Sequence, residues 1–180
     1  MWDPAVYRRF GAERSRPFHD LVARIGAERP RAVADLGCGP GDLTAMLARR
    51  WPGARVTGLD SSAEMIDRAA AVVPEITWTV GDVREWTPPP GLDVLVSNAV
   101  LQWVPGHGEL LTRWAAALPA GAWLAFQVPG NFAAPSHRLR TAPTAHRHPI
   151  PLLCACLPLL LLGRRAVIRN FRAASITADS

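Results

Sequence analysis

The chain contains no lysine, and all 20 of its basic residues are arginine. Its three cysteines, Cys38, Cys154 and Cys156, form neither a disulfide framework nor the spacing of a zinc site. No basic region followed by an apolar core opens the sequence, so we expect no signal peptide and a cytoplasmic protein. The sequence therefore disfavours a disulfide-stabilised secreted scaffold and a structural metal, and we assign no metal ligand.

Charge is unevenly spread along the 180 residues. The net charge is +5 and the sequence pI is about 10.3, values that can indicate nucleic-acid binding. However, residues 1–140 carry 15 arginines and 14 acidic residues, whereas residues 141–180 carry five arginines and one acidic residue. Because the excess lies in the tail, we expect no nucleic-acid partner.

Long hydrophobic runs are also lacking. The most apolar stretch, residues 150–162, is shorter than the roughly 20 residues that a membrane-spanning helix needs, and Pro151 and Pro158 interrupt it. We therefore expect no stable membrane insertion. Nothing in the sequence indicates self-association, and we expect a monomer.

A glycine-rich segment stands at the centre of the sequence pattern. Residues 33–41 read V-A-D-L-G-C-G-P-G, a short apolar run followed by Gly37, Gly39 and Gly41. An amphipathic segment, residues 42–51, comes next, so the pattern predicts a strand, a tight turn and a helix. Glycine is needed where the backbone turns sharply or approaches a ligand closely. The turn could also be purely structural, because a glycine triplet alone is weak evidence for a ligand.

Two acidic residues narrow the choice of ligand. Asp35 precedes the first glycine by two residues and would repel a diphosphate, which disfavours a dinucleotide. It suits S-adenosylmethionine, which carries an ammonium and a sulfonium and no phosphate. Asp60 ends the next apolar strand and can accept hydrogen bonds from ribose hydroxyls, but NAD sites use the same device. Asp60 alone therefore does not choose between the cofactors.

Helical and strand patterns alternate along most of the chain. This alternation predicts an α/β, Rossmann-like fold in which five parallel strands are flanked by helices. Ser61 and Glu64 form a capping box at the start of the second of the helices that follow the glycine turn. We expect strands at 32–36, 55–60, 75–80, 92–97 and 122–128, and helices at 2–25, 42–51, 63–72 and 109–118.

Further polar candidates follow the third and fourth strands. Asp82 can accept a hydrogen bond from an adenine amino group, although a helix-capping role is equally plausible. Asn98 and Gln102 can hold a carboxylate or carbonyl group. Trp103 could line a methyl-transfer cavity, but a buried core tryptophan is the commoner case.

Several motifs resemble the class I S-adenosylmethionine-dependent methyltransferases. They are D-L-G-C-G-P-G, G-L-D, G-D-V and L-P-A-G-A-W-L-A, which start at residues 35, 58, 81 and 118. Three other patterns are similar to the trans-aconitate 2-methyltransferase family. They are W-D-P-A-V-Y-R-R-F with E-R-S-R-P, S-N-A-V-L-Q-W-V-P, and F-Q-V-P-G-N. The resemblance covers about residues 2–138.

The resemblance implies a role for each matching position. It implies that Asp35 and the three glycines hold the methionine part of the cofactor and that Asp60 holds the ribose. Asp82 and Val83 would contact adenine, and Asn98, Gln102 and Trp103 would lie near the methyl group and the acceptor. The implied acceptor is the polyanion trans-aconitate, and the implied product is a methyl ester.

Such a reaction needs no catalytic base. A carboxylate is already ionised at pH 7, so alignment of oxygen, methyl carbon and sulfur is enough and we assign no catalytic residue. A tricarboxylate needs donors, and arginine forks suit carboxylates best. Arg14 and Arg16 are our candidates, because the helix expected at residues 2–25 could cross the carboxyl edge of the sheet and cover the cofactor.

The pattern changes after residue 138. We expect a methyltransferase domain at residues 1–138 and an atypical, poorly ordered tail at residues 139–180, in which we find no defensible strand or helix period. We interpret the tail as coding read out of frame. The last strands of the family fold would then be missing and the fifth strand would have an unpaired edge. The chain could accordingly be an inactive cofactor-binding fragment.

Overall fold

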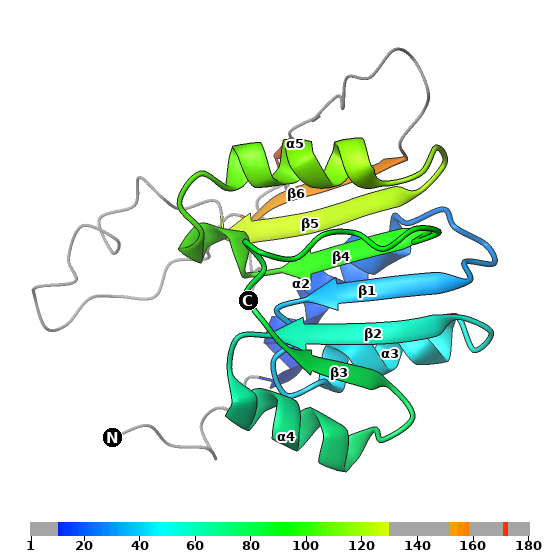
Figure 1. Ribbon diagram of the computed structural model, residues 1–180, viewed down its shortest axis with the longest axis vertical. Coiled ribbons are helices and arrows are strands. Elements are labelled where there is room, and N and C mark those ends of the chain that lie inside the picture. Colours follow the sequence, from blue (N-terminus) through cyan, green and yellow to red (C-terminus); the bar gives the residue numbers. More distant parts are fainter. Residues whose placement is uncertain (1–10, 130–151, 159–170, 173–180) are drawn as a thin grey trace, which may run out of the picture.

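The computed structural model describes residues 11–129, 152–158 and 171–172 (Figure 1). Side chains are described for residues 15–128. The centre of the fold is one sheet with the strand order β3-β2-β1-β4-β5-β6-β7. The first five strands pair in parallel, as expected. They are β1 Ala32–Leu36, β2 Arg55–Asp60, β3 Thr77–Val80, β4 Val94–Asn98 and β5 Trp123–Pro129.

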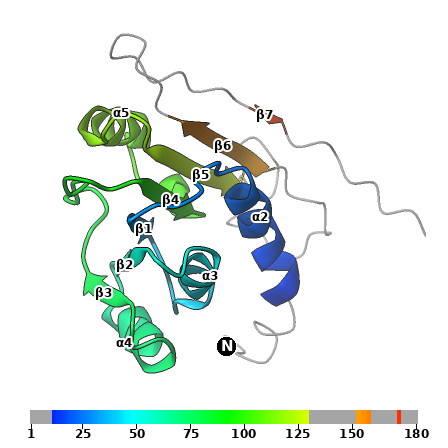
Figure 2. The same ribbon diagram turned by 90° about the vertical axis from the view of Figure 1, so that its right-hand side faces the viewer.

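Helices cover both faces of this sheet (Figure 2). One face carries α2 (Gly11–Ala23) and α3 (Asp42–Arg50), where Phe18, Leu21 and Leu47 are fully buried. The other face carries α5 (His107–Ala117), whose Trp114 is fully buried. Burial on both sides explains why the central strands read as continuous apolar runs.

The helix α4 (Ala63–Val72) packs beside β2 and β3 at one end of the sheet. Its N-cap is Ser62, whose side chain accepts a hydrogen bond from the backbone N–H of Met65 at 3.4 Å. The capping box expected from Ser61 and Glu64 is therefore wrong by one residue. Two serines in succession offer the same capping chemistry, and the local backbone decides which one is used.

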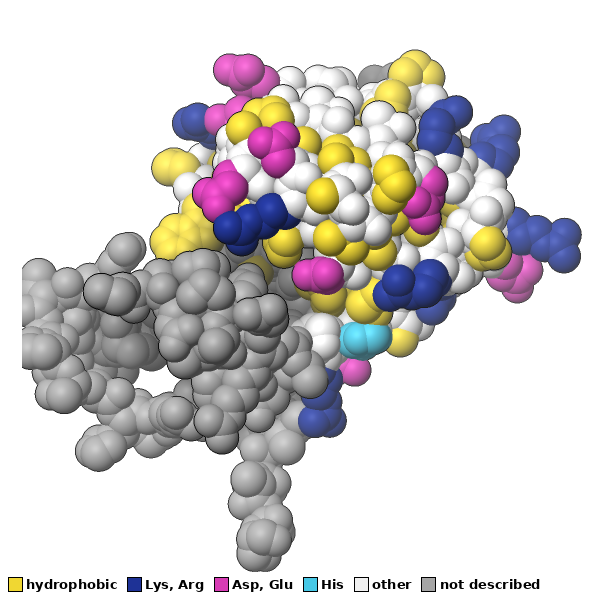
Figure 3. Space-filling view, turned by 90° about the horizontal axis from the view of Figure 1, so that it is seen from below, with side chains coloured by type: hydrophobic (Ala, Val, Ile, Leu, Met, Phe, Trp, Pro, Cys, Tyr) yellow, Lys and Arg dark blue, Asp and Glu magenta, His cyan; other side chains and the backbone are white. Residues whose placement is uncertain are grey.

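Strand β3 forms the open edge at this end of the sheet. Figure 3 views the molecule from this end, where apolar side chains are interspersed with acidic and arginine side chains. Val72 and Val80, at the ends of α4 and β3, are among the exposed large apolar residues. No described helix is long and apolar enough to cross a membrane.

The other end of the sheet departs from expectation. Strand β6 (Leu152–Pro158) pairs antiparallel with all seven residues of β5, and β7 (Phe171–Arg172) pairs antiparallel with β6. The expectations that the last strands are missing, that β5 has an unpaired edge and that the tail lacks a strand were therefore wrong for this segment. A continuous apolar run has no alternation to reveal a strand, and Pro158 is tolerated at the strand's end.

The N-terminal helix also differs from expectation. Within the described residues it begins at Gly11 and packs its apolar side chains onto the sheet face beside α3, so this part does not lie across the carboxyl edge. Residues 2–10, which complete the expected helix, lie outside the described residues, as do residues 130–151.

Candidate functional site

The carboxyl ends of the parallel strands bring most of the predicted site residues to one edge of the sheet. The glycine turn follows β1, Asp60 ends β2, Asp82 follows β3 and Asn98 ends β4. Ligands of open α/β sheets bind at this edge. The topology therefore assembles in space a set of residues that spans more than 60 positions of sequence.

Asp60 fastens the turn to the neighbouring strand. Its Oδ2 accepts the backbone N–H of Gly39 at 2.9 Å, and its Oδ1 accepts the backbone N–H of Ser62 at 2.9 Å. The backbone N–H groups of Gly37 and Cys38 donate to the carbonyl of Leu59. Each Asp60 oxygen has a second acceptor position, so the carboxylate can hold the turn and still accept hydrogen bonds from a diol.

The three glycines of the turn have different surroundings, although all have positive φ. A Cβ on Gly37 would lie 1.9 Å from Cγ2 of Val100, and one on Gly41 would lie 2.8 Å from both Ala69 and Trp78. A Cβ on Gly39 would meet no atom within 4 Å. Close packing therefore explains Gly37 and Gly41, whereas Gly39 faces open space that a ligand can use.

Asp35 lies under the turn and is only 2% exposed. Its Oδ2 accepts a hydrogen bond from the hydroxyl of Thr44 at 2.6 Å. Burial raises the pKa of Asp35 to about 6, the Thr44 hydrogen bond opposes that rise, and the nearby Asp60 carboxylate adds to it. Asp35 therefore remains mostly ionised at pH 7.

Cys38 sits inside the same turn. Burial, together with the neighbouring carboxylates of Asp35 and Asp60, raises the pKa of the Cys38 thiol to about 12. The thiol is therefore protonated at pH 7 and serves as a small buried side chain.

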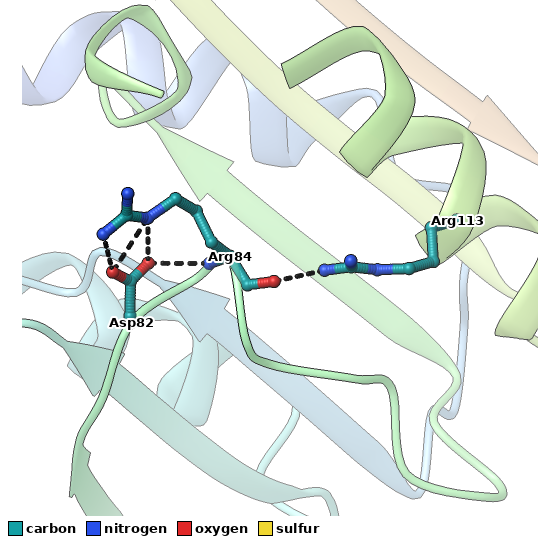
Figure 4. A network of polar contacts seen from close by, with 3 residues as sticks. All are labelled: Asp82, Arg84 and Arg113. Carbon is teal, nitrogen blue, oxygen red and sulfur yellow. Dashed lines mark hydrogen bonds and ion pairs between the residues drawn. The ribbon is translucent and has the colours of Figure 1, made fainter. Parts of the chain in front are cut away.

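Asp82 is engaged by a neighbour that the sequence reasoning did not consider (Figure 4). Its carboxylate accepts hydrogen bonds from Nε and Nη2 of Arg84 and from the Arg84 backbone N–H. These contacts lower the pKa of Asp82 to about 2. Arg113 of α5 donates to the carbonyl of Arg84, which joins the loop after β3 to that helix (Figure 4).

The Asp82 carbonyl also accepts backbone N–H groups from Glu85 and Trp86. Asp82 thus begins a turn at residues 83–85 and caps no helix, so the helix-capping role considered from the sequence does not apply here. The adjacent Val83 is buried in the cluster that packs under α5. Any contact of Asp82 or Val83 with adenine remains a proposal.

The segment after β4 forms a small amide network. Asn98 Oδ1 accepts a hydrogen bond from Nε2 of Gln127 on β5. Ala99 has a φ of 57°, and its carbonyl accepts Nε2 of Gln102 at 2.7 Å. Because that carbonyl requires a donor, the Gln102 amide is oriented with Oε1 away from it, and Oε1 is buried without a hydrogen-bond partner among the described residues.

The remaining residues predicted to bind the acceptor are Trp103, Arg16 and Arg14. Trp103 lies in the short helix η1 (Leu101–Trp103) and is 68% exposed, so it is not the core residue that tryptophan usually is. Arg16 is exposed on α2. The side chain of Arg14 lies outside the described side chains, so its predicted role stays untested.

Sequence reasoning missed Thr44, Arg84 and Gln127. Gln127 carried a usable signal, because it is a polar residue inside the apolar run of β5. Thr44 and Arg84 carried none, because both lie in ordinary helix and loop patterns. The described residues contain no group of three or more His, Cys, Asp or Glu side chains that could hold a metal ion.

Comparison with known proteins places this arrangement in a family. The family model described as "Methyltransferase domain" matches residues 33–121, which run from β1 through α5. This segment therefore belongs to a methyltransferase domain. The resemblance predicted from the sequence motifs is therefore confirmed.

Curated methyltransferases with high similarity share one name. The trans-aconitate 2-methyltransferase of Mycobacterium tuberculosis (strain ATCC 25177 / H37Ra) is 54% identical over 158 residues, which are 88% of this chain and 59% of that protein. The trans-aconitate 2-methyltransferase of Mycobacterium sp. (strain KMS) is 59% identical over 138 residues, 77% of this chain and 54% of that protein. The chain thus spans little more than half the length of these relatives. A 158-residue match in a 180-residue chain also extends past residue 138.

Solved methyltransferase structures share the fold. The S-adenosylmethionine-dependent methyltransferase from Mesorhizobium loti superposes with a TM-score of 0.56 at 28% identity, covering 62% of this chain and 52% of that chain. The Haemonchus contortus phosphoethanolamine N-methyltransferase 2, in complex with S-adenosyl-L-methionine, superposes with a TM-score of 0.57 at 24% identity, covering 64% of this chain and 28% of that chain. The Rossmann-like fold predicted from the sequence is confirmed.

Proposed function

We propose that the chain binds S-adenosylmethionine at the carboxyl edge of the sheet. We further propose that the protein to which it corresponds transfers the methyl group to a carboxylate of trans-aconitate, forming a monomethyl ester. The observation that carries the first part is the pair of carboxylates at the glycine turn, Asp35 beneath it and Asp60 beside it. The names of the curated relatives support the second part.

The residues around the turn fit a cationic nucleoside. Gly39 leaves space against the turn, and Asp60 retains acceptor positions for ribose hydroxyls. Asp35 and Asp60 favour positive charge and oppose a diphosphate. The buried Oε1 of Gln102 can accept a hydrogen bond, which an ammonium can donate and a fully ionised tricarboxylate cannot.

Methyl transfer to an ionised carboxylate requires the protein mainly to position the cofactor and the acceptor. When bound, S-adenosylmethionine would supply an electrophilic methyl group, and transfer of that methyl to a carboxylate oxygen would break the carbon–sulfur bond and leave S-adenosylhomocysteine. The Asn98–Gln127 hydrogen bond fixes an amide at the end of β4, and Trp103, in the short helix η1 that follows β4 in the chain, offers an exposed aromatic face. We propose these side chains to orient the acceptor, and Arg14 and Arg16 to supply charge to its carboxylates.

Calorimetric titration with S-adenosylmethionine tests the first part. We expect binding of S-adenosylmethionine and S-adenosylhomocysteine, and no binding of NADH under the same conditions. Tight NADH binding without S-adenosylmethionine binding would overturn the proposal in favour of a dinucleotide site.

A labelled-methyl assay with trans-aconitate tests the second part. Citrate and other small polycarboxylates serve as alternative acceptors, and base-labile methyl incorporation identifies an ester. Methylation of another acceptor in preference to trans-aconitate would refute the substrate assignment while leaving the cofactor assignment intact.

A second candidate, a cofactor-binding fragment without transferase activity, follows from the length of the chain. It covers only 59% of its M. tuberculosis relative. Cofactor binding without methyl transfer to any polycarboxylate would favour this alternative.

A further inference from the structure

Thr44 makes a contact that its position in the helix does not require. It lies near the start of α3, is fully buried, and donates its hydroxyl to Oδ2 of Asp35 on β1 at 2.6 Å. Helical threonines commonly return this hydrogen bond to a backbone carbonyl of their own helix. Here the hydroxyl instead joins α3 to the carboxylate beneath the glycine turn.

The Asp35 carboxylate has few other sources of stabilisation. The charged group that acts on it is another carboxylate, Asp60, and the nearby Cys38 thiol is neutral. Among the described residues, the recorded ion pairs do not include Asp35, and the hydrogen bond recorded for its carboxylate is the one that Oδ2 accepts from Thr44. A hydrogen bond to a buried ionised group is stronger than one between neutral groups, so the Thr44 hydroxyl matters for the charge state of Asp35.

We propose that Thr44 is a positioning residue of the cofactor site, whose hydroxyl keeps the Asp35 carboxylate ionised and leaves Oδ1 to accept a cationic group of the cofactor. This inference rests on the proposed function, because it assumes that the cofactor binds at the glycine turn. It adds a residue that neither the glycine motif nor the family match identifies. The geometry that carries it is the buried side-chain contact between the strand and the helix on either side of that turn.

The test compares Thr44→Val, which removes the hydroxyl at nearly constant shape, with Thr44→Ser, which keeps it. Binding of S-adenosylmethionine and of S-adenosylhomocysteine to the full chain is measured calorimetrically between pH 5 and pH 7.5. Wild-type affinity should fall as the pH drops through about 6, where Asp35 becomes protonated. In Thr44→Val this fall should begin about one pH unit higher, which makes binding roughly fivefold weaker at pH 6.

Two further measurements separate positioning from simple packing. The carboxyl ¹³C resonance of Asp35 in the ligand-free protein should titrate at higher pH in Thr44→Val than in wild type. Thr44→Ser should restore the wild-type titration and binding profile. Asp35→Asn should remove the pH dependence of binding between pH 5 and pH 7, and this holds as a test even if Thr44→Val does not fold.

The outcomes distinguish this inference from the proposed function. If wild-type protein binds S-adenosylmethionine but Thr44→Val has an unchanged pH profile, the role of Thr44 is refuted and the cofactor assignment stands. A pH dependence that persists in Asp35→Asn refutes it equally. If wild-type protein binds neither S-adenosylmethionine nor S-adenosylhomocysteine at any pH, the proposed function itself fails.

Discussion

The carboxylate of Asp60 accepts the backbone N–H of Gly39 at 2.9 Å, which ties the end of β2 to the glycine turn that follows β1. The same carboxylate accepts the N–H of Ser62, the residue that caps α4. One side chain thus fixes the relative positions of a turn, a strand end and a helix start. A ligand that hydrogen-bonds to Asp60 would meet acceptors that are already oriented.

Replacing Asp60 with Asn should loosen the turn and weaken cofactor binding together. An amide offers only one acceptor oxygen, so either the Gly39 or the Ser62 hydrogen bond is lost, at a cost of about 1–3 kcal/mol in unfolding free energy. Affinity for S-adenosylmethionine should fall at least about tenfold, because the ribose loses a charged acceptor. Urea unfolding and calorimetry measure the two effects.

Asp67→Asn is the matched control for this prediction, because Asp67 is exposed on α4. Asp67→Asn should change neither the unfolding free energy nor the affinity for S-adenosylmethionine measurably. If Asp60→Asn bound S-adenosylmethionine with wild-type affinity, Asp60 would not be the residue that holds the ribose.

Gly37 and Gly39 should respond differently to substitution by alanine. Gly39→Ala should fold, losing about 1–2 kcal/mol because its φ is positive, and should lose cofactor affinity because the methyl group occupies the open space. Gly37→Ala should be less stable still, because its Cβ would lie 1.9 Å from Val100. Thermal unfolding ranks the variants, and an unaffected affinity in Gly39→Ala would show that the ligand does not approach this glycine.

The sequence was a good guide to the parallel strands and a poor guide to the last part of the sheet. Apolar runs ending in polar residues marked β1 and β2, because buried strands present their final side chains at the carboxyl edge. Strand β6 is equally apolar, yet its pairing with β5 is antiparallel and long-range. Nothing local in the sequence encodes such a pairing.

The candidate site was likewise predicted only in part from the sequence. The turn, Asp35 and Asp60 follow from motif and topology. The partners of individual side chains do not: Asp82 pairs with Arg84, and Asp35 with Thr44, through χ angles that periodicity cannot report. Trp103 is exposed because the short helix η1 buries Leu101 instead, which an apolar segment with two amides does not reveal.

Substitution of Trp103 and of Trp114 should distinguish a residue of the proposed acceptor site from a residue of the core. Trp103 is 68% exposed and Trp114 is fully buried. Trp103→Ala should therefore change the unfolding free energy by no more than about 0.5 kcal/mol, whereas Trp114→Ala should cost about 3–5 kcal/mol. If the chain transfers methyl groups, Trp103→Ala should raise the acceptor KM while cofactor affinity stays constant. Strong destabilisation by Trp103→Ala would contradict its exposure.

Arg84 should lower the pKa of Asp82. Hydrogen bonds from the Arg84 side chain and backbone lower the pKa of Asp82 to about 2. In Arg84→Ala the carboxyl should titrate closer to its ordinary value of about 4, because the guanidinium is removed while the backbone contact remains. Carboxyl ¹³C NMR measures this directly.

Arg68→Ala provides the control, because Arg68 pairs with Glu64 on α4. It should leave the Asp82 titration unchanged. An Asp82 carboxyl that still titrates near 2 in Arg84→Ala would assign the pKa shift to the backbone alone.

The buried negative charge of Asp35 should lower the free energy of unfolding at neutral pH. The pKa of Asp35 is raised in the folded protein to about 6 from its ordinary value of 3.8, so the folded state binds the proton more tightly than the unfolded state. The resulting stabilisation is present below about pH 4 and is lost as the pH rises through about 6. Asp35→Asn keeps an acceptor for Thr44 and removes the buried charge. It should therefore match wild type at pH 4 and be more stable at pH 7, by up to about 3 kcal/mol.

Urea unfolding between pH 4 and pH 8 measures this difference, and Asp67→Asn should show no such pH-dependent gain. The stabilised Asp35→Asn protein should at the same time bind S-adenosylmethionine more weakly, because the charge that costs stability attracts the cationic ligand. A variant that is both more stable and equally tight in binding would show that Asp35 is not part of the cofactor site. If the stability difference does not vary with pH, Asp35 does not titrate between the two states.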